Sequence, residues 1–143
     1  MITMEPVWKE KFYIGTSKLN GSWVYSPLCA GITNVDPSVN EQTQQYFFMC
    51  GNGGADNEVT GIAPQYNVSG RRIYGDVAQD YIAKLKYKLG DERKTSFKVV
   101  TDKETIIADC TITDIVDFGG PATDNEPFSC TIRVNGLPTV SDN

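Results

Sequence analysis

The chain has 143 residues, of which 40% are hydrophobic and 22% are charged, as expected for one folded globular domain spanning residues 1–143. Its 13 basic and 18 acidic residues give a net charge of −5, which disfavours tight binding to nucleic-acid phosphates. The sequence contains no apolar run long enough to cross a membrane and no recognisable secretion signal, so we expect a protein made in the cytoplasm without membrane contact.

Histidine is absent, although it is the most common general base in enzymes and the usual partner of a catalytic serine or cysteine. The glycine-rich segment at residues 51–54 lacks the lysine and hydroxyl residue that follow in a phosphate-binding loop. We therefore expect no enzyme activity, no catalytic residues and no cofactor.

The four cysteines do not form the close pairs that are typical of structural zinc sites. Cys110 and Cys130 occupy apolar positions in alternating segments, which predicts small buried core residues with free thiols. A cytoplasmic chain is kept reduced, so Cys29 and Cys50 are also expected to be unpaired. We expect no metal site.

The N-terminal part of the chain has the pattern of a β-hairpin. Two β-favouring segments, at residues 11–15 and 22–25, flank an Asn-Gly turn signal at residues 20–21. A further short strand is predicted at residues 32–35. Pro37 marks either a break after that strand or a sheet edge, because proline cannot donate a ladder hydrogen bond.

Residues 40–60 change character abruptly. A polar stretch at residues 41–45 precedes the apolar Tyr46, Phe47, Phe48 and Met49, and a glycine- and asparagine-rich stretch follows. Such a composition predicts a long extended arm with a binding role. The alternative, that residues 46–50 form a core strand of a hairpin, is equally compatible with the sequence.

One helix is predicted over residues 77–89. Asp76 is a suitable N-cap, Gln79 completes a capping-box pattern, and Gly90 is a suitable left-handed stop. Helical spacing predicts one apolar stripe that packs on a sheet, made of Ala78, Ile82, Leu85 and Leu89.

The remaining sequence predicts half-buried strands. Apolar residues alternate with polar ones around Phe97, Cys110 and Cys130, and a Gly/Pro/Asn-rich connection at residues 117–125 favours antiparallel pairing. The predicted fold is mainly β, an antiparallel β-sandwich or half-barrel with one flanking helix and a long extended loop. The same alternation turns Asp109 away from the core.

Three segments carry a family resemblance: VTGIAP at residues 59–64, GDVAQDYI at residues 75–82 and RKT at residues 93–95. Over residues 31–140 the chain resembles the major tail tube protein of lambda-like bacteriophages, whose tails are non-contractile. This resemblance implies a virion protein that forms stacked hexameric rings, a hollow tube for genome delivery. It also implies partners: further copies of itself, a tape-measure protein, tail tip and terminator proteins, and DNA that passes without tight binding.

The tube interpretation assigns roles to particular residues. Asp109 is the candidate for a negatively charged lumen, although Lys98 and Arg133 would share its surface and make the wall mixed. Two alternatives remain: a tube of a contractile tail or tail-derived particle, and a monomeric carbohydrate-binding module using Trp8, Trp23 and Tyr25. The candidates for subunit contacts are Tyr46, Phe47, Phe48, Met49, Arg71 and Arg72.

Overall fold

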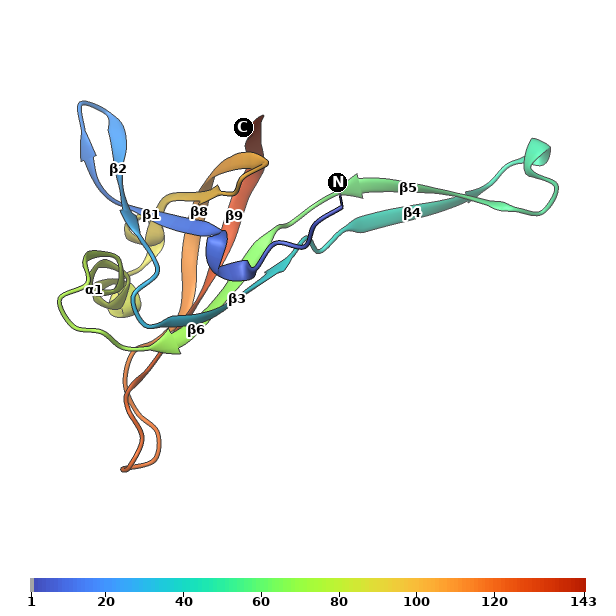
Figure 1. Ribbon diagram of the computed structural model, residues 1–143. Helices are drawn as coiled ribbons and strands as arrows, with labels where there is room; N and C mark the ends of the chain where they lie inside the picture. The colour runs from blue at the N-terminus through green and yellow to red at the C-terminus, as the bar shows by residue number, and fades with distance from the viewer. Residues whose placement is uncertain (1) are drawn as a thin grey trace.

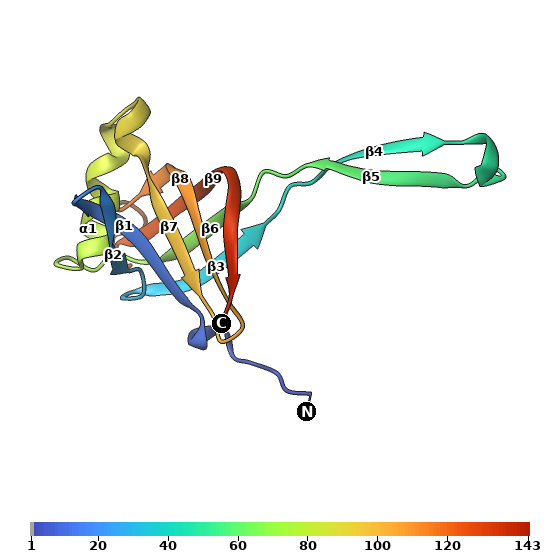
Figure 2. The same ribbon diagram turned by 90° about the horizontal axis from the view of Figure 1, so that it is seen from above.

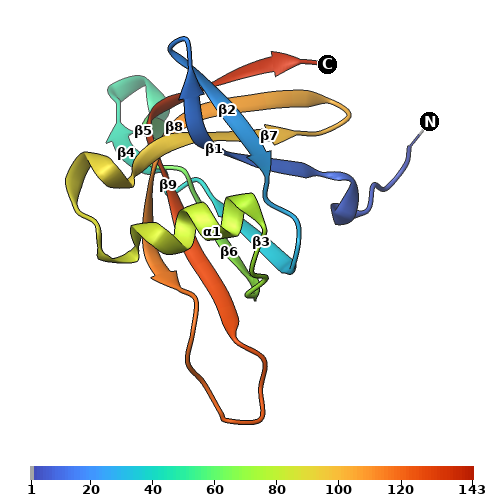
Figure 3. The same cartoon turned by 90° about the vertical axis from the view of Figure 1, so that its left-hand side faces the viewer.

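The computed structural model describes residues 2–143, and its main element is an antiparallel sheet of seven strands in the order β2-β1-β7-β8-β9-β6-β3. The sheet is curved, and α1 packs across one side of it (Figure 3). This confirms the predicted mainly β half-barrel with one flanking helix. The strands are β1 (Lys11–Leu19), β2 (Ser22–Pro27), β3 (Ile32–Ser38), β6 (Gln65–Arg71), β7 (Lys94–Val100), β8 (Glu104–Val116) and β9 (Pro127–Asp142).

The hydrophobic core lies on one face of this sheet, because alternate strand residues point to the same side. Phe97 on β7 pairs with Ala108 on β8, and both side chains are buried. The Phe97 ring centroid lies 4.9 Å from that of Tyr66 on β6. The other buried strand residues of the core are Ile14, Val68, Val99, Cys110, Ile112, Phe128, Cys130 and Ile132.

The N-terminal hairpin is formed by β1 and β2. Asn20 and Gly21 connect the two strands with φ angles of 53° and 82°, and positive values at both positions are what a tight type I′ turn requires. The predicted short strand at residues 32–35 is the beginning of β3, which continues to Ser38 at the edge of the sheet. Its edge position accommodates Pro37.

The helix is shorter than predicted. α1 spans Val77–Lys84 and tightens into a 3₁₀ turn, η3 (Leu85–Tyr87). Asp76 caps it as expected, since its carboxylate accepts a hydrogen bond from the Gln79 N–H. Ala78, Ile82 and Leu85 are buried, which leaves Leu89 as the exception.

No helix within residues 2–143 is long and apolar enough to cross a membrane.

The prediction that Leu89 completes the packed stripe is wrong, because its side chain is 85% exposed. The cause is Arg93, which closes a second 3₁₀ turn, η4 (Gly90–Arg93). Its guanidinium donates hydrogen bonds to the carbonyl oxygens of Lys86, Lys88 and Ile112, at 2.7, 2.9 and 3.2 Å. These bonds fix residues 86–88 after the last helical turn, where Lys88 is already extended and the 3.6-residue period no longer applies.

The predicted arm is a separate two-stranded hairpin that projects far beyond the body of the subunit (Figures 1 and 2). β4 (Gln42–Phe47) pairs with β5 (Ala55–Gly61), and the 3₁₀ turn η2 (Met49–Gly51) lies at its tip. The predicted long extended loop is thus a regular ladder over residues 42–47 and 55–61, and the glycine-rich residues 51–54 lie in the connection between its strands. The core-strand alternative is wrong, because all six residues of β4 are exposed.

Candidate assembly surfaces

The face of the sheet opposite the core is polar across five strands, and we call it the polar face. Asp109 on β8 is exposed there, opposite Ser96 on β7 and Asn135 on β9. Lys98 and Arg133 lie on the same face, as the alternation predicted, so acidic and basic residues are mixed. The remaining residues of this face include Asn34, Asp36, Gln65, Asn67, Ser69, Thr111, Thr113, Ser129 and Thr131.

Hydrogen bonds between neighbouring side chains hold the polar face in place. Arg133 donates to Thr113 Oγ1 at 3.1 Å and to Gln65 Oε1 at 3.0 Å, and its Nη2 lies 3.6 Å from an Asp114 carboxylate oxygen. Asn67 and Thr131 form a similar cross-strand bond of 2.9 Å. Since most of these groups are uncharged and already paired, the surface is hydrophilic and offers few free cations to phosphates.

Besides the arm, three stretches at the edges of the seven-stranded sheet, β2, β3 and part of β9, have no outer partner in the described residues. β2 and β3 are the outermost strands of the sheet. In addition, β9 pairs with β6 only as far as Arg133, so the segment from Asn135 to Asp142 is paired with β8 on one side alone. Free edges expose unpaired N–H and C=O groups and are suited to pairing with another chain.

The arm exposes a cluster of large apolar side chains that we call the arm tip: Tyr46, Phe47, Phe48 and Met49. Their exposed fractions range from 40% for Tyr46 to 99% for Met49. The Tyr46 and Phe48 rings stack with centroids 5.7 Å apart. An apolar cluster of this kind at the end of a protruding hairpin is suited to contact with another protein.

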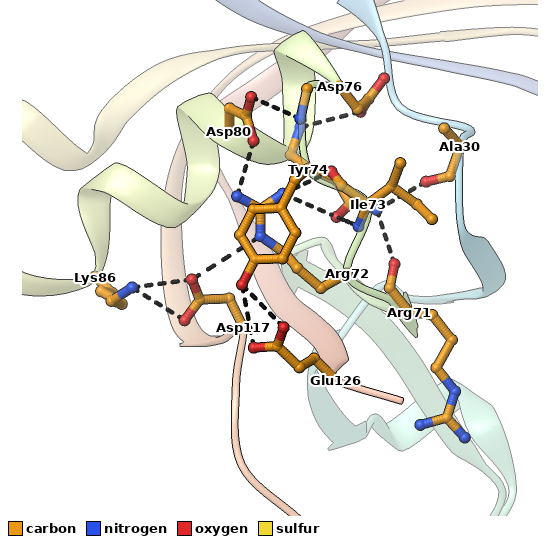
Figure 4. Close-up of polar contacts among 12 residues, drawn as sticks. Ala30, Arg71, Arg72, Ile73, Tyr74, Asp76, Asp80, Lys86, Asp117 and Glu126 are labelled. Atoms are coloured by element: carbon orange, nitrogen blue, oxygen red, sulfur yellow. Dashed lines mark hydrogen bonds and ion pairs between the residues drawn. The ribbon is translucent and has the colours of Figure 1, made fainter. Parts of the chain in front are cut away.

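A buried polar network joins α1 to the loops on either side of it (Figure 4). Gln79 is its centre and is fully buried. The Gln79 side-chain nitrogen donates to the carbonyl oxygens of Ala30 and Arg71 at 2.7 and 3.0 Å. Its side-chain oxygen accepts from the N–H of Ile73 at 2.8 Å. Gln79 therefore does not close a capping box, because its side chain is used to hold the segment that leads into α1.

Arg72 lies inside the subunit, which corrects its assignment to an exposed contact surface. Its side chain is 5% exposed, and its Nη2 forms an ion pair of 2.8 Å with Asp80. Its Nε lies 4.0 Å from an Asp117 carboxylate oxygen. The same carboxylate forms an ion pair of 2.9 Å with Lys86 Nζ. These pairs attach the loop after β8 to the helix. Arg71 is exposed and donates to the Asn125 carbonyl oxygen at 3.3 Å, and its role as a contact residue stays a prediction.

The same loop is attached at its far end by Tyr74, whose hydroxyl donates to both carboxylate oxygens of Glu126 at 3.0 and 3.1 Å (Figure 4). This hydrogen bond raises the pKa of Tyr74, because ionisation would place a phenolate beside the Glu126 carboxylate. The carboxylates of Asp117 and Glu126 thus already form ion pairs or hydrogen bonds with other side chains of the subunit. Among the described residues, no group of three or more Cys, Asp or Glu side chains is arranged to hold a metal ion.

The cysteines fall into two environments. Cys110 and Cys130 are buried, and desolvation raises the pKa of each thiol to about 12. Cys29 and Cys50 are exposed, the latter at the arm tip. All four are free thiols.

The aromatic residues considered for carbohydrate binding do not form one exposed platform. Trp8 is 74% exposed. Trp23 is half-buried, and the Lys18 ammonium lies over its ring in a cation–π contact, 4.8 Å from the ring centroid. Tyr25 is tied to Ser96 by a 2.8 Å hydrogen bond. Nothing in this arrangement supports the carbohydrate-binding alternative.

No protein-family model and no curated protein matches the chain. Solved structures do match along nearly its whole length. One chain, from the tail of an empty gene transfer agent particle with C6 symmetry, has a TM-score of 0.76 at 14% identity, covering 96% of this chain and 99% of that chain. A chain of a native gene transfer agent virion gives 0.71 at 15% identity, with coverages of 96% and 99%.

A third match is a chain of an extracellular contractile injection system, the PVC sheath-tube complex in its extended state, with a TM-score of 0.60 at 12% identity and coverages of 96% and 91%. At such low identities the matches establish the fold alone. The chain has the fold of proteins found in the tail of a gene transfer agent and in a contractile injection system.

Proposed function

We propose that the chain is a structural tail tube subunit, which forms hexameric rings that stack into a conduit for genome delivery. The observation that carries this proposal is the end-to-end fold match to a chain in a tail with C6 symmetry. The whole chain, 1–143, would form one tube domain. We propose no enzymatic role and a location in the virion tail, with assembly in the host bacterium.

The unpaired strand edges support ring formation. A ring closes when one surface of a subunit binds a different surface of its neighbour, and pairing of sheet edges in this way removes free edges. β3 and the second half of β9 are available for such pairing. The polar face is the surface that we assign to the lumen, with Asp109 on the wall. Its paired, hydrophilic side chains suit DNA that slides past without binding.

The type of tail follows the structural matches rather than the lambda-like resemblance. The matched chains come from a gene transfer agent and a contractile injection system, so we propose a tail-derived particle or contractile-type tube before a lambda-like one. Tape-measure, tail tip and terminator proteins would be its partners within the tail.

The experiment is electron microscopy of the purified chain, with helical averaging of any tubes. We expect hollow tubes of six-fold rings with the polar face lining the lumen, and no retention of duplex DNA at physiological salt. A stable monomer at high protein concentration contradicts the proposal. Retained DNA or a positively charged lumen contradicts the assignment of the wall.

A further inference from the structure

We propose that the arm tip of one subunit docks on the surface around the end of α1 of a copy in the next ring. We call this the helix-end surface, and it comprises Lys84, Tyr87, Lys88 and Leu89. The inference rests on the proposed tube and identifies the surface that joins one ring to the next.

The two surfaces are chemically complementary. Tyr87 and Leu89 are 79% and 85% exposed, so the helix-end surface offers apolar area to the apolar arm tip. Lys84 and Lys88 are exposed beside them. Residues 84–94 contain five basic and two acidic residues, whereas residues 41–61 contain three acidic residues and no basic one. Opposite charges around an apolar centre steer association and fix its register.

The two surfaces also lie at opposite ends of the subunit. α1 lies at one end and the arm extends from the other both in Figure 1 and in the view from above in Figure 2. In the view along that direction, α1 is in front and the arm is behind (Figure 3). Head-to-tail stacking requires a pair of different, complementary surfaces at opposite ends. From Gln42 to Met49 the arm spans about 25 Å at ~3.3 Å per residue, which takes its tip well outside its own subunit.

The native thiol at the arm tip provides the test. In a Cys29→Ser background, Cys50 is the only exposed cysteine of the described residues, and Leu89→Cys adds a second at the helix-end surface. Assembled tubes are treated with diamide, which oxidises two neighbouring thiols to a disulfide, and are run on a non-reducing gel. We expect a ladder of trimers and larger species, because each subunit then links to the one before and the one after it.

Two controls make the result specific. Adding Cys50→Ser to the Leu89→Cys variant leaves each subunit with one exposed thiol in the described residues, so the products must be limited to dimers. Val7→Cys, in place of Leu89→Cys, puts a thiol beside the apolar groove lined by Trp8, Phe12 and Leu28, the competing docking surface. A ladder with Val7→Cys and none with Leu89→Cys overturns the inference. The inference is also overturned if the wild-type chain forms tubes but the Leu89→Cys variant gives no ladder. If the wild-type chain forms no tubes, the proposed function is overturned as well.

A charge exchange gives a second, independent readout. Lys84→Glu with Lys88→Glu, or Asp56→Lys with Glu58→Lys, should reduce the mass of sedimented tubes at least about tenfold, since each set places like charges together. Combining both sets should restore tubes. Unreduced tubes in both charge-reversed variants contradict the inference.

Discussion

The side-chain nitrogen of Gln79 donates a 2.7 Å hydrogen bond to the carbonyl oxygen of Ala30, which joins the first turn of α1 to the segment between β2 and β3. Gln79→Leu has nearly the same shape but removes the partly buried hydrogen bonds to the backbone groups of Ala30, Arg71 and Ile73. We expect a loss of about 3 kcal/mol in the free energy of unfolding, measured with urea. Gln44→Leu, on exposed β4, is the control and should change it by less than about 0.5 kcal/mol. Equal effects contradict the assigned role.

The buried charge network predicts a second effect on stability. Asp117→Asn leaves Lys86 and the buried Arg72 with one carboxylate fewer, and we expect a cost of about 3 kcal/mol. The matched control is Glu92→Gln, which removes an exposed pair with Lys88 and should cost less than about 0.5 kcal/mol. If Asp117→Asn were as stable as the control, the loop after β8 would not depend on this ion pair.

Two leucines of one predicted stripe now have opposite environments. Leu85→Ala removes a buried core side chain and should destabilise the subunit by about 2–5 kcal/mol, whereas Leu89→Ala should change stability by less than about 0.5 kcal/mol. Thermal and urea unfolding of both variants measure the difference. A large cost for Leu89→Ala in the monomer would mean that the helix continues as the sequence suggests.

The residues in and after α1 show which parts of the helix can be predicted from sequence. The Asp76 cap and the burial of Ala78, Ile82 and Leu85 depend on positions within one or two turns, so the local pattern contains them. The position of Leu89 depends on Arg93, whose side chain reaches the carbonyl oxygen of Ile112 on another strand. The Gln79 side chain likewise reaches Ala30 in the segment before β3, 49 residues earlier in the chain. Periodicity carries no information about such distant bonds.

The assembly surfaces divide in the same way. The composition of residues 40–60 was compatible with an exposed arm and equally with a core strand at residues 46–50, whereas the alternation around Cys110 placed Asp109 away from the core. The free edge of β9 could not be predicted, because it arises from strand pairing: β6 begins at Gln65, opposite Arg133, and leaves the rest of β9 unpaired on that side. The burial of Arg72 was missed for the same reason, since its partners Asp80 and Asp117 belong to two different elements.

The buried thiols predict a pH dependence. Cys110 and Cys130 have pKa values of about 12 in the folded protein, against 9.0 for an exposed thiol. Between these values the thiols are ionised only in the unfolded chain, so stability is complete below about pH 9 and falls by about 1.4 kcal/mol per pH unit for each thiol above it. Urea unfolding at several pH values above 9 measures this fall in the free energy of unfolding. The fall should be shallower for the double variant Cys110→Ala with Cys130→Ala than for the wild-type chain. An unchanged slope contradicts this account.

The arm should be dispensable for folding and required for tubes. β4 and β5 pair only with each other, and an isolated two-stranded hairpin is marginally stable in water, so amide exchange of residues 42–61 should be fast in the free subunit and slow in tubes. Replacing residues 42–61 by a short Gly-Ser turn removes no core residue, because none of them is buried. We expect an unfolding midpoint close to that of the full chain and no sedimenting tubes. Phe47→Ser with Phe48→Ser, which keeps the hairpin, should have the same effect on assembly. Normal tubes from either variant, or slow exchange of the arm in the monomer, would show that ring stacking does not depend on it.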